Sequence, residues 1–438
     1  MAFQQALSGL NSATKAIDST SNNIANANTV GFKASTTNFG DVYAASLNGS
    51  GASQVGIGVN IASIQQQFTQ GNITSTNNPL DISINGTGFF RMDQDGATTY
   101  ARNGQFHLDK NGFVVNDQAM RLTGYRAQAG IIVPSSPQPL QISASDLAPQ
   151  ATGLNASSVF NGVKANLNLD SRQTVPALPW VDGGIAGGLA AFTPDPQTYN
   201  YSTALSIYDT LGNAQTMTYY FRKTANAGEW DVYANVDGTT NQNITPGGGP
   251  IGTLTFGPTG TITAGSPMNV SVNMLGVMQS LGQPTGNGAL AVQSFPVDFA
   301  GTTQFGSAFG TNRLEQDGYA AGNLVGLSVG SDGIIQGRYS NGQTFAQGQI
   351  VLANFTNPNG LQALGNNQWS ETSVSGPALV GAPNTSNLGV LSSSTVEESN
   401  VDLTAELVKL ITQQRSYQAN AQSIKTQDQL LQTLVNLR

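Results

Sequence analysis

The stretch AFQQALSGLNSATKAIDSTSNNIANA, residues 2–27, places mostly apolar side chains at alternating spacings of four and three residues. The same rhythm returns at the other end of the chain, over residues 399–438. This 4-3 spacing is the pattern of a coiled-coil seam, so both ends are predicted to be helices that assemble through it. The predicted assembly positions are Phe3, Leu7, Leu10, Ile17, Ile24, Leu403, Leu407, Leu410, Tyr417, Ala421, Ile424, Leu431 and Val435.

Local signals set the limits of the two predicted helices. The first helix, residues 2–27, runs into an Asn-rich segment that ends at Gly31, and Asn and Gly close helices because they tolerate the left-handed conformation. The second helix is predicted to begin near Ser399, because Ser399 and Asp402 fit a capping pattern. The preceding carboxylates, Glu397 among them, are then expected to stabilise the positive end of the helix dipole.

Between the helices the apolar period changes to two, which is typical of strands. Asn-Gly and Asp-Gly pairs, such as Asp95-Gly96 and Asn103-Gly104, recur between these strands and favour tight hairpin turns. Pro and Gly concentrate in residues 134–149 and 176–196, which marks a boundary between two β regions. The predicted fold class is α+β and multidomain. Terminal α-helices form a coiled-coil-like core, and of two mainly antiparallel β domains the outer one is inserted in the inner one.

These changes of pattern divide the chain into six predicted segments. Two of them are rich in Ser, Asn and Gly without a sustained period, and are expected to be extended connectors. The segments are an N-terminal core helix (1–27), a connector (28–72), a discontinuous inner β domain (73–147 with 311–362), an outer β domain (148–310), a second connector (363–398) and a C-terminal core helix (399–438).

The composition argues against several classes of protein. The net charge of −8 disfavours nucleic acid as a partner, and the absence of cysteine excludes disulfides and thiolate metal sites. No apolar run is long enough to span a bilayer, and the first residues lack the features of a secretory signal. We therefore expect no membrane insertion, and either a cytoplasmic protein or one exported without a cleaved peptide. Only 10% of residues are charged, against about 25% in ordinary domains, which suits self-association or a bland secreted β-protein.

Motifs of catalysis are weak in this chain. Residues 326–330 match G-x-S-x-G, but they lead into an Asp-Gly hairpin instead of the helix that a nucleophile elbow requires. The single histidine, His107, lies in a predicted strand. Residues 93–96 resemble the start of a calcium loop, yet the glycine comes too early. We predict no catalytic, cofactor-binding or metal-binding residue, and a structural role instead of an enzyme.

The apolar stripes by themselves leave two architectures open. A subunit that binds the next copy through a different patch forms rings or open helices, and bundled terminal helices with β domains outside would make a tube. The alternative is an intramolecular helical hairpin packed on the β core, or a closed coiled-coil dimer.

Two terminal motifs resemble signatures of a known family. Residues 22–33, NNIANANTVGFK, resemble the amino-terminal signature of the bacterial flagellar rod and hook proteins, an axial family. Residues 400–404, NVDLT, and 414–421, QRSYQANA, resemble its carboxy-terminal signature. Residues 206–212, SIYDTLG, are similar to the outer domain of the hook branch, and the length of the chain also favours that branch. The motif positions are Asn23, Asn26, Gly31, Phe32, Arg415 and Asn420.

The resemblance implies a function and a set of partners. It implies a homopolymer of many copies, a curved and bendable helical tube that transmits torque from the flagellar rod to the filament. The implied partners are the distal rod protein, a hook cap, the hook–filament junction protein and the flagellar export apparatus. The implied location is the extracellular flagellum, reached without a cleaved signal peptide, and no cofactor is implied. A distal rod-type axial protein and a secreted β-rich adhesin with oligomerising helices remain alternatives.

Overall fold

The computed structural model describes residues 2–42, 56, 58–128, 130–143, 146–155, 160–181, 194–245, 249–284 and 287–436. The chain divides into two compact units. Unit 1 contains Met1–Ser143, Gly326–Arg338 and Thr344–Arg438, and unit 2 contains Ala144–Val325 and Tyr339–Gln343. Unit 1 therefore comes from both ends of the chain and unit 2 is inserted into it. The predicted class, terminal helices with one β domain inserted in another, is confirmed.

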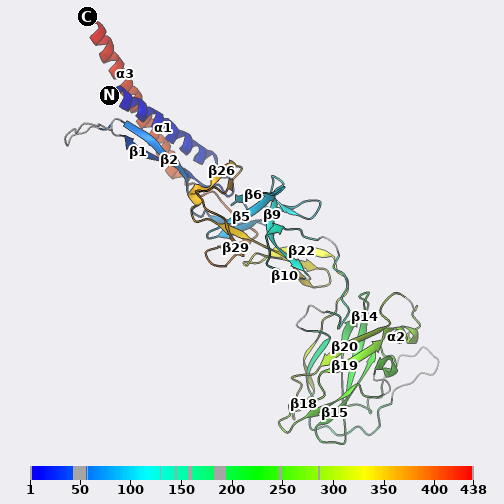
Figure 1. Ribbon diagram of the computed structural model, residues 1–438. Helices are drawn as coiled ribbons and strands as arrows, with labels where there is room; N and C mark the ends of the chain where they lie inside the picture. The colour runs from blue at the N-terminus through cyan, green and yellow to red at the C-terminus, as the bar shows by residue number, and fades with distance from the viewer. Residues whose placement is uncertain are drawn as a thin grey trace. The chain divides into compact units, whose positions relative to one another are not determined.

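The two terminal helices belong to unit 1 and pack against each other (Figure 1). Helix α1 spans Ala2–Ala25 and helix α3 spans Leu403–Asn436. The start predicted near Ser399 is wrong by four residues. The Asp402 carboxylate accepts hydrogen bonds from the backbone N–H of Thr404 at 2.9 Å and of Ala405 at 3.1 Å. Asp402 is therefore the N-cap itself, a role in which aspartate is favoured.

The segment expected as the first extended connector contains a β-hairpin. Strands β1 (Ser35–Val42) and β2 (Gly58–Gln66) pair antiparallel, and both contact α1 (Figure 1). Their side chains are half-buried or exposed, with none fully buried. These strands pack against α1 instead of against an apolar core. Their sequence therefore lacks the apolar alternation that would have predicted them.

The main sheet of unit 1 joins strands from both ends of the chain. Strand β24 pairs antiparallel with β9, and β27 pairs antiparallel with β6. Strands that precede unit 2 in the sequence and strands that follow it are therefore neighbours in one sheet. In spatial order its main path is β22 (Leu324–Val329), β23 (Ile334–Tyr339), β24 (Thr344–Ile350), β9 (Arg121–Gln128), β5 (Phe89–Gln94), β6 (Ala97–Ala101), β27 (Gln368–Ser370) and β26 (Gln362–Gly365).

Short strands complete unit 1 and replace the second expected connector. Strand β30 (Thr395–Glu397) pairs with β3 (Ile73–Ser75), and β29 (Val390–Ser393) pairs with β4 (Ile82–Asn85). Trp369 of β27 is 2% exposed and packs edge-to-face against Phe89. Residues 363–398 are thus part of the folded unit. The remaining short elements are β7 (His107–Leu108), β8 (Val114–Val115), β10 (Ile131–Ile132), β11 (Gln138–Pro139), β25 (Leu352–Asn354), β28 (Leu379–Gly381) and η2 (Pro358–Gly360).

The glycine-containing pairs play two different roles. Asp95 and Gly96 both have positive φ, at 50° and 92°, and form the two-residue turn between β5 and β6 as predicted. The hairpin turn predicted at Asn103-Gly104 does not form. A Cβ at Gly104 would lie 1.7 Å from the carbonyl oxygen of Ile82, so this glycine is needed for close backbone packing instead.

Unit 2 contains two five-stranded sheets with a shared aromatic and aliphatic core. The side chains of Trp230, Tyr219, Phe221 and Phe299 are fully buried in that core. One sheet has the order β13 (Tyr201–Tyr208), β14 (Ala214–Lys223), β15 (Glu229–Val236), β17 (Gly252–Phe256) and β18 (Ile262–Ala264). The other has the order β16 (Ile244–Thr245), β19 (Met268–Asn273), β20 (Val292–Asp298), β12 (Val163–Asn168) and β21 (Gly310–Gln316), and two short helices, η1 (Asn241–Asn243) and α2 (Met274–Ser280), accompany it.

The boundary expected after residue 310 lies inside unit 2. Strand β21 pairs along its length with β12, from Val163 opposite Gln316 to Asn168 opposite Gly310. Unit 2 continues to Val325. The Gly-rich sequence before β21 resembles the end of a domain, but it is a loop that returns the chain to the edge of a sheet.

Candidate functional site

The predicted stripe of α1 lies on a face that the chain itself covers poorly. Phe3 is 46% exposed and Leu7 is 42% exposed, while Leu10, Ile17 and Ile24 are half-buried. The buried face of this helix consists instead of small or polar side chains: Ala6, Ser12, Ala13, Ala16, Thr20 and Asn23. The large apolar side chains of α1 are therefore available for contacts outside the chain.

Helix α3 is exposed along almost its whole described length. Glu406 is its only buried side chain among those the structure describes. Of the predicted stripe, Leu403, Leu407, Tyr417 and Leu431 are exposed, whereas Leu410, Ala421 and Ile424 are half-buried. The side chain of Val435 lies outside the described residues. A helix with so little burial gains most of its stability from packing that this single chain does not supply.

Small and polar groups make the contact between α1 and α3. The Asn23 carboxamide donates to the Glu406 carboxylate at 3.2 Å, and Lys409 pairs with Glu406 at 2.6 Å. Further along, a Cβ at Gly9 would lie 2.9 Å from the side-chain nitrogen of Asn420. Glycine therefore allows the two helices to approach at Asn420, a motif position. Arg415, also a motif position, is exposed on α3.

Two asparagines of the amino-terminal motif shape the end of α1. The side chain of Asn23 accepts from the backbone N–H of Ser35 and donates to its carbonyl, both at 2.9 Å. This pair of bonds holds β1 against the helix. Asn26 donates to the carbonyl of Asn22 at 2.9 Å and accepts from the Thr29 hydroxyl at 3.1 Å, which closes the last turn.

Gly31 and Phe32 turn the chain from the helix towards the sheet. Gly31 has a φ of +71°, and a Cβ there would lie 2.7 Å from the backbone nitrogen of Asn103. Its N–H donates to the carbonyl of Glu397 at 2.8 Å. Phe32 is 8% exposed. The turn therefore requires glycine twice, for its left-handed backbone and for the close approach.

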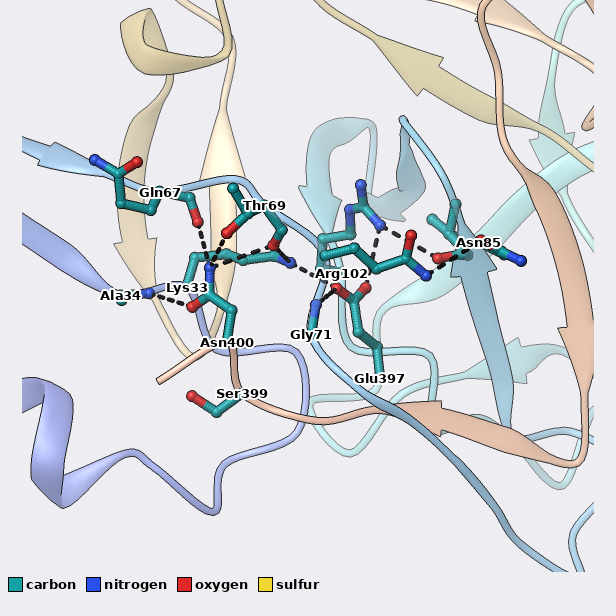
Figure 2. A network of polar contacts seen from close by, with 12 residues as sticks. Lys33, Ala34, Gln67, Thr69, Gly71, Asn85, Arg102, Glu397, Ser399 and Asn400 are labelled. Atoms are coloured by element: carbon teal, nitrogen blue, oxygen red, sulfur yellow. Dashed lines mark hydrogen bonds and ion pairs between the residues drawn. The ribbon is translucent and has the colours of Figure 1, made fainter. Parts of the chain in front are cut away.

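Three buried charges, Lys33, Arg102 and Glu397, meet beside this turn and are named here the ion cluster (Figure 2). The Lys33 Nζ lies 2.6 Å from Glu397 Oε1, and Arg102 Nη1 lies 3.1 Å from Glu397 Oε2. The exposed fractions of the side chains are 0% for Lys33 and Glu397 and 4% for Arg102. Glu397 Oε1 also accepts from the N–H of Gly71 at 2.9 Å.

The electrostatics of the ion cluster depend on Glu397. Burial is the main influence on the pKa of the Lys33 amine and lowers it; the Glu397 carboxylate opposes this, and Arg102 adds to it. Burial likewise lowers the pKa of the Arg102 guanidinium, again opposed by Glu397. Two cations thus share one carboxylate. Backbone carbonyls accept further hydrogen bonds from both cations, Thr69 O from Lys33 at 2.7 Å and Gly86 O from Arg102 at 2.8 Å.

Asn400 extends this network to the start of α3 (Figure 2). Its side-chain oxygen accepts from the N–H of Ala34 at 2.8 Å. Its amide donates to the carbonyl of Gln67 at 2.7 Å and to the Thr69 hydroxyl at 2.9 Å. The segment after α1, the end of β2 and the segment before α3 are therefore held together by one carboxamide and one carboxylate.

Sequence reasoning missed the ion cluster. It interpreted Glu397 as a residue at the positive end of a helix dipole, but Glu397 is the last residue of β30 and is fully buried. The available signal was Lys33, a cation next to the apolar Phe32 in an end region with very few charges. Such a lysine needs a buried partner, although sequence spacing alone cannot identify a partner 364 residues away.

The described residues offer little for catalysis. Ser328 of the G-x-S-x-G match lies within β22 and leads to a turn, and the exposed His107 side chain lies 4.0 Å from Asp117. In the part of the chain that the structure describes, no group of three or more His, Cys, Asp or Glu side chains could hold a metal ion. No described helix has the length and apolar character needed to cross a membrane. What the arrangement can do is hold the terminal helices to the sheet.

Comparison with known proteins gives a consistent result along the chain. Four family models match, each on a separate segment. They are the flagella basal body rod protein (residues 3–33), the flagellar hook protein FlgE/F/G D1 domain (83–146), the flagellar basal body protein FlaE D2 domain (168–319) and the flagellar basal body rod FlgEFG protein C-terminal model (392–437).

Full-length relatives and a solved structure agree with these matches. The flagellar hook protein FlgE of Salmonella typhimurium is 39% identical over 449 residues and that of Escherichia coli 39% over 443, each covering 100% of both chains. That of Borreliella burgdorferi is 33% identical over 453 residues, covering 99% of this chain and 98% of its own. The crystal structure of Helicobacter pylori FlgE2 shares the fold, with a TM-score of 0.51 at 13% identity over 73% of this chain and 98% of its own. This chain belongs to the flagellar hook protein family.

Proposed function

We propose that this chain is the structural subunit of a bacterial flagellar hook and assembles into a curved, bendable helical tube that transmits torque from rod to filament. The observation that carries the proposal is the exposure of the apolar stripes on both terminal helices. Phe3 and Leu7 on α1, and Leu403 and Leu407 on α3, are each more than 40% exposed. Burial of one such side chain contributes up to about 1.5–3 kcal/mol, which favours association of copies.

The ion cluster supports the torque-transmitting part of the proposal. Lys33 follows α1, Glu397 precedes α3, and Arg102 follows strand β6 of the main sheet. Short bonds between buried charges resist displacement because separating them would leave charges unpaired in a low dielectric. Twist applied at the helices would therefore reach the sheet of unit 1 without slippage at this junction.

The proposal extends to the surroundings of the polymer. We infer that the chain lies outside the cell in the flagellum, is delivered by the flagellar export apparatus without a cleaved signal, and meets a distal rod protein, a hook cap and a hook–filament junction protein at the ends of the tube. We further propose that the two terminal helices form the inner layer of the tube and that the β sheets of the two units, with the bounds that the structure gives them, form the outer layers. A structural role, and no enzymatic one, fits these surroundings. The full-length hook relatives favour this function over a distal rod protein or a β-rich adhesin.

Electron microscopy of polymers grown from the purified full-length chain tests the proposal. Wild-type protein is expected to form tubes. The variants Leu7→Ser and Leu407→Ser are expected to raise the critical concentration for assembly at least about tenfold, because about 1.4 kcal/mol of lost contact energy changes an equilibrium tenfold. Val374→Ser is the matched control, since Val374 is 67% exposed in unit 1 but lies on neither helix. Wild-type protein that stays monomeric, or a control as defective as the helix variants, would contradict the proposal.

A further inference from the structure

A groove of about 350 Å³ lies in unit 1 between α1, α3 and the β1–β2 hairpin. Its floor is made of small side chains of α1, including Gly9, Ser12 and Ala13. Gln413 and Ser416 of α3 form one wall, and Phe39 of β1 stands on the other side. The groove has no charged lining residue. It is therefore a small-residue channel with the size and chemistry to receive a large uncharged side chain.

One polar atom in the groove lacks a partner. The side-chain oxygen of Gln413 is buried and accepts no hydrogen bond from the residues that the structure describes. A buried acceptor without a donor costs about 1–3 kcal/mol. The Gln413 side chain is flexible, so rotation of its carboxamide towards a partner in the groove would let this oxygen accept from an N–H donor and would remove the cost.

The same chain carries side chains that fit the groove. Phe3 is exposed on α1, and its neighbour Gln4 is also exposed and carries an amide with two N–H donors. Phe3 does not line the groove of its own chain. It lies on the same helix as the lining residues Ser12 and Ala16, nine and thirteen residues earlier, at a rise of about 1.5 Å per residue. A Phe3 side chain that enters this groove must therefore come from another molecule.

We propose that the groove receives the Phe3 side chain of a second copy of this chain, with Gln4 of that copy donating to Gln413. The inference rests on the proposed function, in which copies assemble through their terminal helices. Each subunit would then present the Phe3 side chain to one neighbour and the groove to another. Such a heterologous contact does not close on itself and propagates as a ring or an open helix, which a tube requires.

Disulfide trapping tests the contact directly, because the chain contains no cysteine of its own. The double variant Phe3→Cys with Ser416→Cys is assembled and mildly oxidised, and the products are separated on a non-reducing gel. A ladder of covalently linked oligomers is expected. The control pairs Phe3→Cys with Gln418→Cys, because Gln418 is exposed on α3 but does not line the groove, and it is expected to stay monomeric on the gel.

The outcomes separate the two proposals. Wild-type protein that forms no polymer overturns the proposed function, and this inference with it. Polymers of the groove pair that show no ladder, or a ladder of equal extent in the control, overturn this inference alone.

A second variant pair covers the case in which the cysteine proteins fail to assemble. Ser416→Leu fills the groove with a side chain of its own, and is expected to raise the critical concentration about tenfold while the circular dichroism and thermal unfolding of the monomer stay unchanged. Gln418→Leu adds the same side chain to α3 outside the groove and is expected to assemble like wild type. Equal effects of the two leucines would overturn the inference.

Discussion

At the scale of single residues, Glu397 decides how the parts of unit 1 are joined. It offsets two buried cations and also accepts from a backbone N–H. A buried ion pair adds little to stability compared with an apolar replacement, because both partners lose their hydration. Its removal is costly for another reason: the remaining charges stay buried without an opposite charge. The cluster therefore specifies one arrangement of Lys33 and Arg102 more than it strengthens the fold.

This argument predicts the effect of Glu397→Gln. The substitution keeps the shape of the side chain but leaves Lys33 and Arg102 buried without a counter-charge, so the free energy of unfolding of unit 1 is expected to fall by about 3–5 kcal/mol. Urea unfolding followed by circular dichroism measures the change. Asp18→Asn is the control, because Asp18 pairs with Lys15 where both side chains are 58% exposed, and such pairs contribute below about 1 kcal/mol. Similar losses in the two variants would refute the special role of Glu397.

At the scale of elements, the sequence predicts those helices and turns that a local pattern of residues specifies. Both terminal helices follow from the 4-3 spacing, and the turn at Asp95-Gly96 follows from the need for positive φ. The β1–β2 hairpin and the strands within residues 363–398 escape prediction because tertiary partners stabilise them. For β1 the partner is α1, and for Trp369 it is an aromatic cluster around Phe89. The ion cluster escapes for the same reason, since its members are distant in sequence.

The start of α3 provides a prediction at this scale. Asp402→Ala removes the side chain that accepts from Thr404 and Ala405, and is expected to destabilise the first turn of the helix by about 1 kcal/mol. Ser399→Ala is the matched variant, because Ser399 lies outside the helix and its hydroxyl accepts only a 3.3 Å bond from Val401 among the bonds described. Amide hydrogen exchange at Thr404 and Ala405 measures both. Faster exchange in the Ser399 variant than in the Asp402 variant would contradict the assignment of Asp402 as the N-cap of α3.

At the scale of the whole molecule, the two units differ in how their buried groups titrate. Burial raises the pKa of Tyr219, Tyr220 and Tyr233 in unit 2. In unit 1, burial and then the Glu371 carboxylate raise the pKa of Tyr100 to about 12, but burial lowers the pKa of Lys33. A raised tyrosine pKa means that the folded state keeps its phenolic proton up to a higher pH than the unfolded state does. The lowered lysine pKa has the opposite effect on stability.

Alkaline pH is therefore expected to destabilise unit 2 more than unit 1. The contribution of the unit 2 tyrosines to stability is complete below pH 10, the unfolded pKa, and is lost as the pH rises through their raised folded pKa values. In unit 1 the lowered pKa of Lys33 reduces stability at low pH, and this cost disappears as the pH rises to 10.5, the unfolded pKa. The resulting gain in stability partly offsets the loss that comes from Tyr100. Calorimetry at pH 8 and pH 11 measures the two transitions, and Trp369→Phe leaves unit 2 as the source of tryptophan fluorescence, from Trp180 and Trp230. If unit 1 unfolds at a lower temperature than unit 2 at pH 11 but not at pH 8, the predicted order of alkaline destabilisation is wrong.

The separation of 364 positions between Lys33 and Glu397 makes the folding of unit 1 depend on whether synthesis has been completed. A nascent or truncated polypeptide that stops before Glu397 contains both cations of the ion cluster but nothing to neutralise them. It also lacks β30, the partner of β3, and the whole of α3. The middle of the chain holds every residue of unit 2 and suffers no such loss. Because Glu397 and α3 are made last, we expect the ion cluster to delay the folding of unit 1 until the chain is almost complete.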